Sequence, residues 1–211
     1  MFITNYWDDL HTKYSKAEWI DKPSIFSQWV ISYLPKEGKL LDLEAGQGQD
    51  SRYFAQQEYE VTSTDFAEEG LEFNRAKSKD LSINIHTLDL SETFPYEDDL
   101  YDVVYAHLSV HYFNFEITQQ LFSEIYRVLK PGGIFAVLTN SMSDPEIEGY
   151  AKLEDKYYRG PSGVTKRYFT VESMKKFANQ FEVIVADEKG ETYKDRAVCV
   201  RNLIRFVGKK Q

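Results

Sequence analysis

The chain has 211 residues, 42% hydrophobic and 15% aromatic, which is enough for one domain with a substantial core. Its 34 acidic residues outnumber its 25 basic ones, and this net charge of −9 disfavours nucleic acid as the main partner. No apolar run approaches the roughly 20 residues of a membrane span, and the acidic start lacks the layout of a secretory signal. The one cysteine, Cys199, fits a reducing compartment, so we expect a cytoplasmic protein with no membrane partner.

Residues 1–35 are rich in aromatic side chains and follow a helical pattern, which predicts an N-terminal helical cap with Pro23 in a first helical turn. From residue 39 onward, strand and helix signals alternate. The predicted strands are 39–43, 60–65, 83–89, 101–108 and 134–140, and the predicted helices between them are 50–57, 67–79 and 117–129. Regular βα alternation with short connections predicts an α/β fold, in which a doubly wound, Rossmann-like sheet carries helices on both faces.

The last third of the chain has a different pattern. Residues 141–169 are polar, aromatic and punctuated by glycine and proline, and we expect an irregular insertion with a short helix that forms a substrate lid. A helix is predicted over 170–181, and strands over 182–189 and 196–208 are predicted to form an antiparallel pair at one end of the sheet. Cap, sheet and insertion are expected to form a single domain, 1–211.

The stretch "LLDLEAGQGQDS" (40–51) reads as a strand, a Gly-x-Gly turn and the start of a helix. Such a turn places backbone N–H groups and a positive helix end around one small volume. A dinucleotide site would need a third glycine, but Ser51 occupies that position, which disfavours a nicotinamide cofactor. Glu44 stands where such loops usually begin with glycine.

Three carboxylates follow or precede strand ends near this turn. Asp65 ends the second strand, where it would accept hydrogen bonds from ribose hydroxyls or merely cap the next helix. Asp89 ends the third strand and would accept from an exocyclic amine of adenine. Asp42 precedes the turn and would face a ligand ammonium or tie down the loop.

Four segments occur in a characteristic order. They are "LLDLEAGQG" (40–48), "VTSTDF" (61–66), "LDLSETFPYEDDLYDVVYAHLSVHYF" (88–113) and "YRVLKPGGIFAVL" (126–138). Together they resemble the class I S-adenosylmethionine-dependent methyltransferases, in the small-molecule branch that includes tellurite-resistance-like and methyltransferase type 11-like proteins. The resemblance implies a seven-stranded sheet with the last strand antiparallel, and an N-terminal helix, here with "YW" at 6–7, that closes over the cofactor.

The same resemblance implies that S-adenosyl-L-methionine is the cofactor, and it assigns roles position by position. The residues implied to cradle its methionine part are Asp42, Ala45, Gly46 and Gly48. Asp65 would hold the ribose, and Phe66 would lie against the adenine. Asp89 and the backbone of Leu90 would bind the adenine edge, and His107 would lie near the sulfonium. Glu44 would take the place of a family glycine in this cofactor loop.

Proton transfer from a hydroxyl or amine acceptor would need a base, and His107 and His111 follow the fourth strand at the carboxyl edge of the sheet. Either histidine would equally suit local hydrogen bonds, and a soft acceptor such as a thiol would need no base. The lid carries tyrosines (Tyr150, Tyr157, Tyr158 and Tyr168) and, among its cations, Arg159, Lys166 and Arg167, which suggest an anionic or aromatic small molecule. No metal ligand set is predicted.

Three functions remain open from the sequence. The first is a methyltransferase that acts on a small-molecule acceptor by in-line displacement. The second is a non-catalytic relative that binds the cofactor or its product, or a partner-binding module, as the unusual Glu44 would allow. The third is a nicotinamide-dependent oxidoreductase, which Ser51 disfavours.

Overall fold

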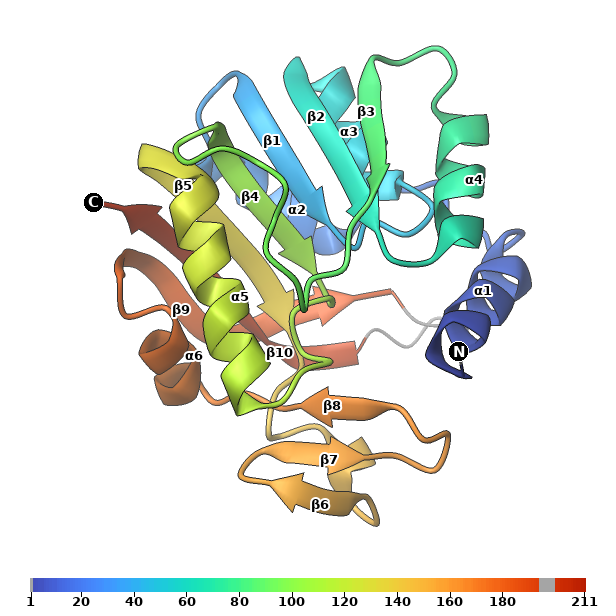
Figure 1. Cartoon of the computed structure of the whole chain (residues 1–211), viewed down its shortest axis with the longest axis vertical. Helices are drawn as coiled ribbons and strands as arrows, with labels where there is room; N and C mark the ends of the chain where they lie inside the picture. Colours follow the sequence, from blue (N-terminus) through green and yellow to red (C-terminus); the bar gives the residue numbers. More distant parts are fainter. Residues whose placement is uncertain (1, 194–199) are drawn as a thin grey trace.

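The structure is a computed structural model that describes residues 2–193 and 200–211. In this part of the chain, seven strands form one twisted sheet in the order β3-β2-β1-β4-β5-β10-β9 (Figure 1). These strands are β1 (Gly38–Leu43), β2 (Tyr59–Asp65), β3 (Ile83–Thr87), β4 (Tyr101–His107), β5 (Leu129–Thr139), β9 (Phe181–Thr192) and β10 (Val200–Lys210). The helices are α1 (Phe2–Tyr14), α2 (Ile25–Val30), α3 (Gln49–Gln56), α4 (Glu68–Lys77), α5 (Phe115–Val128) and α6 (Val171–Phe177).

The strand directions confirm the predicted Rossmann-like fold. Strands β1, β2, β3, β4 and β5 pair in parallel, whereas β10 lies between β5 and β9 and is antiparallel to both. The chain order reverses between β1 and β4, and open α/β sheets bind ligands beyond the carboxyl ends of the strands at such a switch point. No helix in the described residues is long and apolar enough to cross a membrane.

Alternation along the strands divides the core into two layers. Leu41, Leu43 and Val104 point to the face that α5 and α6 cover, where Phe122 and Met174 join the same buried cluster. The intervening strand residues, among them Leu40, Val103 and Tyr105, pack with α2 and α3 through Phe26 and Phe54. Helices therefore cover both faces, as predicted from the βα alternation.

The N-terminal region contains two helices and the 3₁₀ turn Ile31–Tyr33, but Pro23 is not in a first turn. Helix α2 begins at Ile25, and the hydroxyl of Ser24 caps it by accepting from the Ser27 amide at 3.0 Å. Pro23 therefore precedes the cap. The predicted position was wrong because a serine side chain that satisfies a free helix amide defines the start more strongly than proline does.

The insertion 141–169 differs from the expected irregular segment with a short helix. After the 3₁₀ turn Pro145–Ile147, it forms a three-stranded antiparallel sheet of β6 (Ala151–Glu154), β7 (Tyr157–Arg159) and β8 (Thr165–Arg167). Strands of three or four residues are too short to show alternation in the sequence. This small sheet and α1 both lie beyond the carboxyl ends of the large sheet's strands (Figure 1).

Several predicted boundaries shift. The fifth strand begins at Leu129 rather than 134, because the "KPGG" segment continues the strand instead of breaking it. Helix α6 ends at Phe177, and β9 then extends from Phe181 to Thr192. The strand predicted over 196–208 is described from Val200 to Lys210, so its first residues and Cys199 lie outside the described residues.

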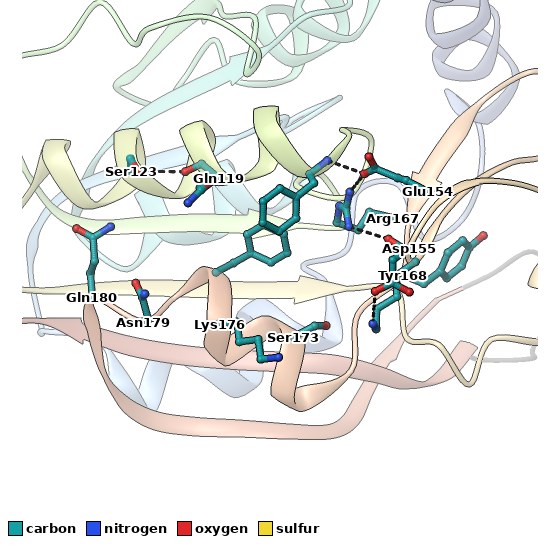
Figure 2. A pocket seen from close by; sticks show the side chains of 13 residues that line it. Gln119, Ser123, Glu154, Asp155, Arg167, Tyr168, Ser173, Lys176, Asn179 and Gln180 are labelled. Carbon is teal, nitrogen blue, oxygen red and sulfur yellow. Dashed lines mark hydrogen bonds and ion pairs between the residues drawn. The ribbon is translucent and has the colours of Figure 1, made fainter.

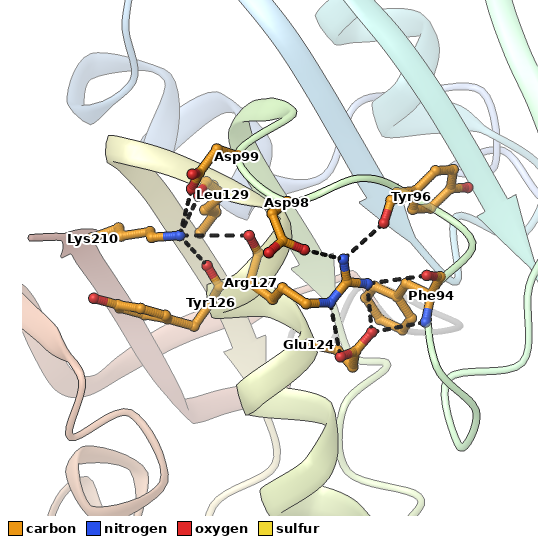
Figure 3. A network of polar contacts seen from close by, with 9 residues as sticks. All are labelled: Phe94, Tyr96, Asp98, Asp99, Glu124, Tyr126, Arg127, Leu129 and Lys210. Atoms are coloured by element: carbon orange, nitrogen blue, oxygen red, sulfur yellow. Dashed lines mark hydrogen bonds and ion pairs between the residues drawn. The ribbon is translucent and has the colours of Figure 1, made fainter.

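The loop between β3 and β4 is tied to α5 by a polar network that Figure 3 shows. The Arg127 guanidinium donates to the carbonyl oxygens of Phe94 (3.0 Å) and Tyr96 (2.8 Å). It also forms ion pairs with Glu124 and Asp98 at 2.7 and 2.8 Å. This clamp fixes the segment that follows Asp89 and Leu90, and therefore the β3 side of the predicted site.

A buried polar chain lies directly beneath the glycine turn. The Ser51 hydroxyl donates to Asp42 Oδ2 at 2.6 Å and lies 2.7 Å from Ser63 Oγ, which accepts from Asn74 Nδ2 at 2.8 Å. Ser51 thus links β1, β2 and α4, which explains a serine where a dinucleotide fold has glycine. Burial, reinforced by the nearby Asp50, raises the pKa of Asp42 to about 8, although the Ser51 hydrogen bond opposes the shift.

The raised pKa predicts how Asp42→Asn changes stability. Between about pH 4 and pH 8, the folded carboxyl keeps a proton that the unfolded chain releases, so its contribution to the free energy of unfolding falls as pH rises through this window. Asparagine keeps an oxygen for Ser51 and does not ionise. The variant should therefore gain stability over the native chain between pH 5 and pH 8, by roughly 1–3 kcal/mol at the upper end.

Urea unfolding at pH 5, 6.5 and 8 measures this difference. Asp80→Asn, at an exposed position, is the control and should show no trend with pH. A stability difference for Asp42→Asn that stays constant across the three pH values would contradict burial of a protonated carboxyl.

Candidate functional site

The turn after β1 is built from residues in the left-handed backbone region. Glu44 and Gly46 both have φ +56°, and Gly48 has φ +75°. Glycine adopts this region freely, whereas a residue with a Cβ incurs a cost of roughly 1 kcal/mol. The backbone strain expected if Glu44 replaces a glycine is therefore present in the structure.

The two glycines are also needed for space. A Cβ on Gly48 would lie 1.9 Å from Asn74 Oδ1, so any side chain there would collide with α4. A Cβ on Gly46 would lie 3.0 Å from the His11 ring, which approaches the turn from α1. Side chains from α4 and α1 therefore pack directly against the two glycines of the turn.

Asp65 lies beside the turn, as its position at the end of β2 predicted. Its Oδ2 accepts from the Gly46 amide and its Oδ1 from the Ala67 amide, both at 2.7 Å. Burial raises the pKa of this carboxyl, and the nearby His11 and the backbone hydrogen bonds oppose that shift. Asp65 thus caps the start of α4, which is one of the two alternatives for this residue, and it also fixes the glycine turn.

Glu44 belongs electrostatically to the same group of acids. Its side chain is partly buried, and burial together with the charges of Asp65 and Asp89 raises its pKa well above the usual range. An interaction with the Phe66 backbone opposes the shift. The carboxyl therefore lies toward the β2 and β3 ends of the site, where a positively charged ligand would stabilise its ionised form.

The remaining predicted adenine contacts lie at the ends of β2 and β3. Phe66 is 37% exposed and so leaves a ring available to a flat ligand. Leu90 is buried, and Asp89 Oδ1 accepts from the amide and hydroxyl of Ser91 at 2.8 and 2.6 Å. One oxygen of Asp89 is thus engaged in a local turn that orients the carboxylate.

Both predicted catalytic histidines lie at the β4 end of the crevice and contact threonine hydroxyls. His107 Nε2 is 3.2 Å from Thr192 Oγ1, and His111 Nδ1 is 3.1 Å from Thr139 Oγ1. Burial lowers the pKa of His107 and lowers that of His111 further, with Lys166 adding to the second shift. Both imidazoles are therefore neutral near pH 7, a form that accepts a proton and does not repel a cationic ligand.

Helix α1 covers the glycine turn through contacts that the sequence did not reveal. The His11 ring fits a slot between Gly46 and Gly70, where a Cβ on Gly70 would lie 2.9 Å from His11 Nε2. Gln47 Nε2 donates to the His11 carbonyl at 2.7 Å. A glycine inside the predicted helix 67–79 was the one signal that pointed to a close approach at this position.

The aromatic pair in the first helix also reaches the crevice. The rings of Trp7 and Tyr112 meet edge to face with centroids 4.9 Å apart, and Tyr112 lies 4.4 Å from the His111 ring. Because Tyr112 follows β4 within the quoted segment 88–113, its proximity to the histidines was available from the sequence. Its contact with α1 was not.

The lid residues divide between two faces of β8. Lys166 Nζ binds Glu146 Oε1 at 2.8 Å, and the buried Tyr168 donates to the same oxygen at 2.7 Å. Arg167 turns away and binds Glu154. Figure 2 shows Arg167 at the edge of a cavity of about 520 Å³ between α5, α6 and the small sheet. None of the residues predicted to bind cofactor or to catalyse lines this cavity.

The predicted lid arginine Arg159 is exposed on β7, and Tyr157 donates to the Tyr112 carbonyl at 3.3 Å. The small sheet is also joined to the β4 end by the Arg167 amide, which donates to the His111 carbonyl at 2.6 Å. The insertion therefore borders the crevice through its backbone and through the Glu146–Lys166 face. No group of three or more potential metal-ligating side chains occurs among the residues that the structure describes.

The crevice suits S-adenosylmethionine on structural grounds. The glycine turn lies at the switch point of the sheet, and the acids Glu44 and Asp65 beside it complement a group that carries an ammonium and a sulfonium. Ser109, two residues past His107, is 2% exposed, and its hydroxyl has no partner among the described residues. Buried hydroxyls normally have a partner, so Ser109 offers a donor or acceptor to a ligand.

Comparison with known proteins identifies several similar methyltransferases. The methyltransferase domain family matches residues 41–137. A demethylmenaquinone methyltransferase from Listeria welshimeri is 31% identical over 113 residues, which are 52% of this chain and 45% of that protein. The chain spans less than half the length of the curated relatives it matches.

Solved structures share the fold over most of the chain. The 1,6-didemethyltoxoflavin-N1-methyltransferase of Burkholderia thailandensis, solved with its substrate and S-adenosylhomocysteine, superposes with a TM-score of 0.76 at 17% identity, covering 99% of this chain and 85% of that one. TehB from Haemophilus influenzae gives a TM-score of 0.66 at 19% identity, covering 88% and 61%. Residues 41–137 thus match the methyltransferase domain family, and the chain shares its fold with solved methyltransferases.

Proposed function

We propose that the chain transfers a methyl group from S-adenosylmethionine to a small-molecule acceptor by in-line displacement. The observation that carries this proposal is the Asp65 carboxylate held 2.7 Å from the Gly46 amide, at the switch point of the sheet. The relatives named above carry the names of methyltransferases for two different small molecules, which supports a small acceptor and leaves its identity open.

The proposed cofactor contacts follow the turn and the neighbouring strand ends. Backbone groups of Ala45, Gly46 and Gly48 would hold the methionine part, with Asp42 beneath them. Asp65 would hold the ribose, and Phe66, Asp89 and Leu90 would contact the adenine. His107 would lie near the sulfonium.

The cofactor supplies an already activated methyl group, so the residues of the chain mainly align the acceptor and exclude water. Helix α1 and the insertion close the crevice from two sides, through the Trp7–Tyr112 contact and the backbone link to His111. For a hydroxyl or amine acceptor, His111 or His107 is the proposed base, since burial keeps both imidazoles neutral by lowering their pKa, although it also weakens their basicity. A non-catalytic, cofactor-binding relative is the alternative, and the strained Glu44 favours it.

Calorimetry separates these functions. S-adenosylmethionine and S-adenosylhomocysteine should bind with dissociation constants in the micromolar range, and NAD should not bind. Asp65→Asn should weaken both sulfur nucleosides by about tenfold or more, since it removes charged acceptors from the site. Absence of binding by either nucleoside would sink the proposal, whereas binding without turnover across a broad acceptor panel would favour the non-catalytic alternative.

Glu44→Gly tests whether the acid is a ligand or a tolerated replacement. Glycine relieves a left-handed strain of roughly 1 kcal/mol, so the variant should be more stable to urea by about that amount. If Glu44 attracts the cofactor's positive groups, affinity for S-adenosylmethionine should fall several-fold. A tighter or unchanged affinity would identify Glu44 as a replacement with no role in binding.

Gly70→Ala tests whether α1 clamps the cofactor turn. The new methyl group would meet the His11 ring at about 3 Å, although alanine favours a helix over glycine by roughly 1 kcal/mol. We therefore expect unchanged or higher thermal stability, with affinity for S-adenosylhomocysteine roughly tenfold lower. Combined with His11→Ala, which empties the slot, the effects should be non-additive. Glu72→Ala on the exposed face of α4 is the control, and purely additive effects would contradict the clamp.

A further inference from the structure

The acceptor side of the crevice is bordered by aromatic rings. They are Tyr6 and Trp7 on α1, Tyr112 after β4, and Tyr150 in the insertion, and we call these four residues the acceptor wall. Trp7 meets Tyr6 and Tyr112 edge to face at 5.1 and 4.9 Å. All four side chains are partly buried, so their rings combine contact with the protein and access to a ligand. Such a wall suits a flat organic molecule.

Two of the cations that suggested an anionic acceptor, Lys166 and Arg167, are already paired, whereas the third, Arg159, is exposed on β7. Lys166 is 2.8 Å from Glu146, and Arg167 lies on the other face of β8, bound to Glu154 and packed over the rings of Phe115 and Phe177. Lys166 and Arg167 are therefore each matched by a carboxylate from the insertion itself. An anionic acceptor would have to displace one of these carboxylates to gain its charge partner.

In contrast, a carboxylate near the acceptor wall can still accept a hydrogen bond from a ligand. Glu146 Oε1 accepts from both Lys166 and Tyr168, whereas Oε2 has only the Tyr150 hydroxyl at 3.3 Å. Burial raises the pKa of Tyr112, and Glu44 and Glu146 add to this shift, so both acids lie near that ring. Although burial opposes it, the hydrogen bonds from Lys166 and Tyr168 lower the pKa of Glu146, so this acid is ionised at neutral pH.

We propose that the acceptor of the methyl group is an amine carried on a flat aromatic or heteroaromatic body, held by the acceptor wall and by Glu146 Oε2. This inference rests on the proposed function and specifies its substrate class. Aromatic faces and a carboxylate are the two groups that recognise a protonated or hydrogen-bonding amine, and the same pair discriminates against a carboxylic acid.

The transfer balances with the groups present. The amine reacts as its free base, and its nitrogen lone pair forms the new N–C bond as the C–S bond breaks. The electron pair of that bond stays on sulfur and yields S-adenosylhomocysteine. An ammonium substrate first loses one proton to solvent, and the methylated nitrogen then carries the positive charge that the sulfur loses.

The test compares amines with acids of matched shape. Tryptamine against indole-3-propionate, and phenethylamine against 3-phenylpropionate, are titrated by calorimetry into the chain saturated with S-adenosylhomocysteine. We expect each amine to bind at least tenfold more tightly than its acid. Acids that bind as tightly as the amines, or a loaded protein that binds neither class, would overturn the amine inference. Failure of S-adenosylhomocysteine itself to bind would instead overturn the proposed function.

Glu146→Gln supplies a readout that a merely structural role would not move. The substitution removes the Glu146 carboxylate and leaves Lys166 without its ion-pair partner. The ratio of amine affinity to acid affinity should therefore fall at least tenfold for each pair of ligands. Affinity for S-adenosylhomocysteine should stay unchanged, which shows that the fold is intact. Glu148→Gln, an exposed glutamate two residues away, is the matched control and should preserve the amine preference. An unaltered preference in Glu146→Gln would remove Glu146 from acceptor recognition.

Discussion

The hydrogen bond from the Gly46 amide to the Asp65 carboxylate is the interaction on which the site depends, because it joins the ends of two neighbouring strands. It requires β1 and β2 in parallel register, Gly46 in the left-handed region, and a buried acid that caps α4 through the Ala67 amide. A buried carboxylate is costly unless its hydrogen bonds are satisfied. Backbone amides of Gly46 and Ala67 satisfy them, so the same hydrogen bonds stabilise the strand ends and shape the cofactor loop.

A series of buried hydrogen bonds beneath the turn also determines its shape. Asp42 is held by Ser51, which in turn meets Ser63 and Asn74. Asn74 also excludes any side chain from Gly48, since its amide oxygen fills the space that a Cβ would need. The polar layer thus explains why Gly48 has no side chain, and the His11 ring from α1 covers the neighbouring Gly46.

Much of the fold could be predicted because βα alternation is a strong local signal, and Asp65 was placed correctly because a strand end fixes an edge position. The small sheet of 151–167 escaped prediction since its three strands are short and their pairing is set by turns at Lys156 and Gly160 rather than by alternation. The His11 slot escaped for another reason. It joins residues from three distant segments, and only Gly70, a poor helix former inside a helix, marked it in the sequence.

Ion pairs within the insertion determine which charged groups are available to a ligand, and the composition of the chain does not show this. The insertion contains several bases, yet Lys166 and Arg167 point to opposite faces of β8 and each meets its own glutamate. The field at the acceptor wall is therefore governed by Glu44 and the second oxygen of Glu146. Glu44 is retained in a conformation that glycine would adopt without strain. Because the neighbouring acids also disfavour its charge, a ligand with positive charge is the partner that offsets both costs at once.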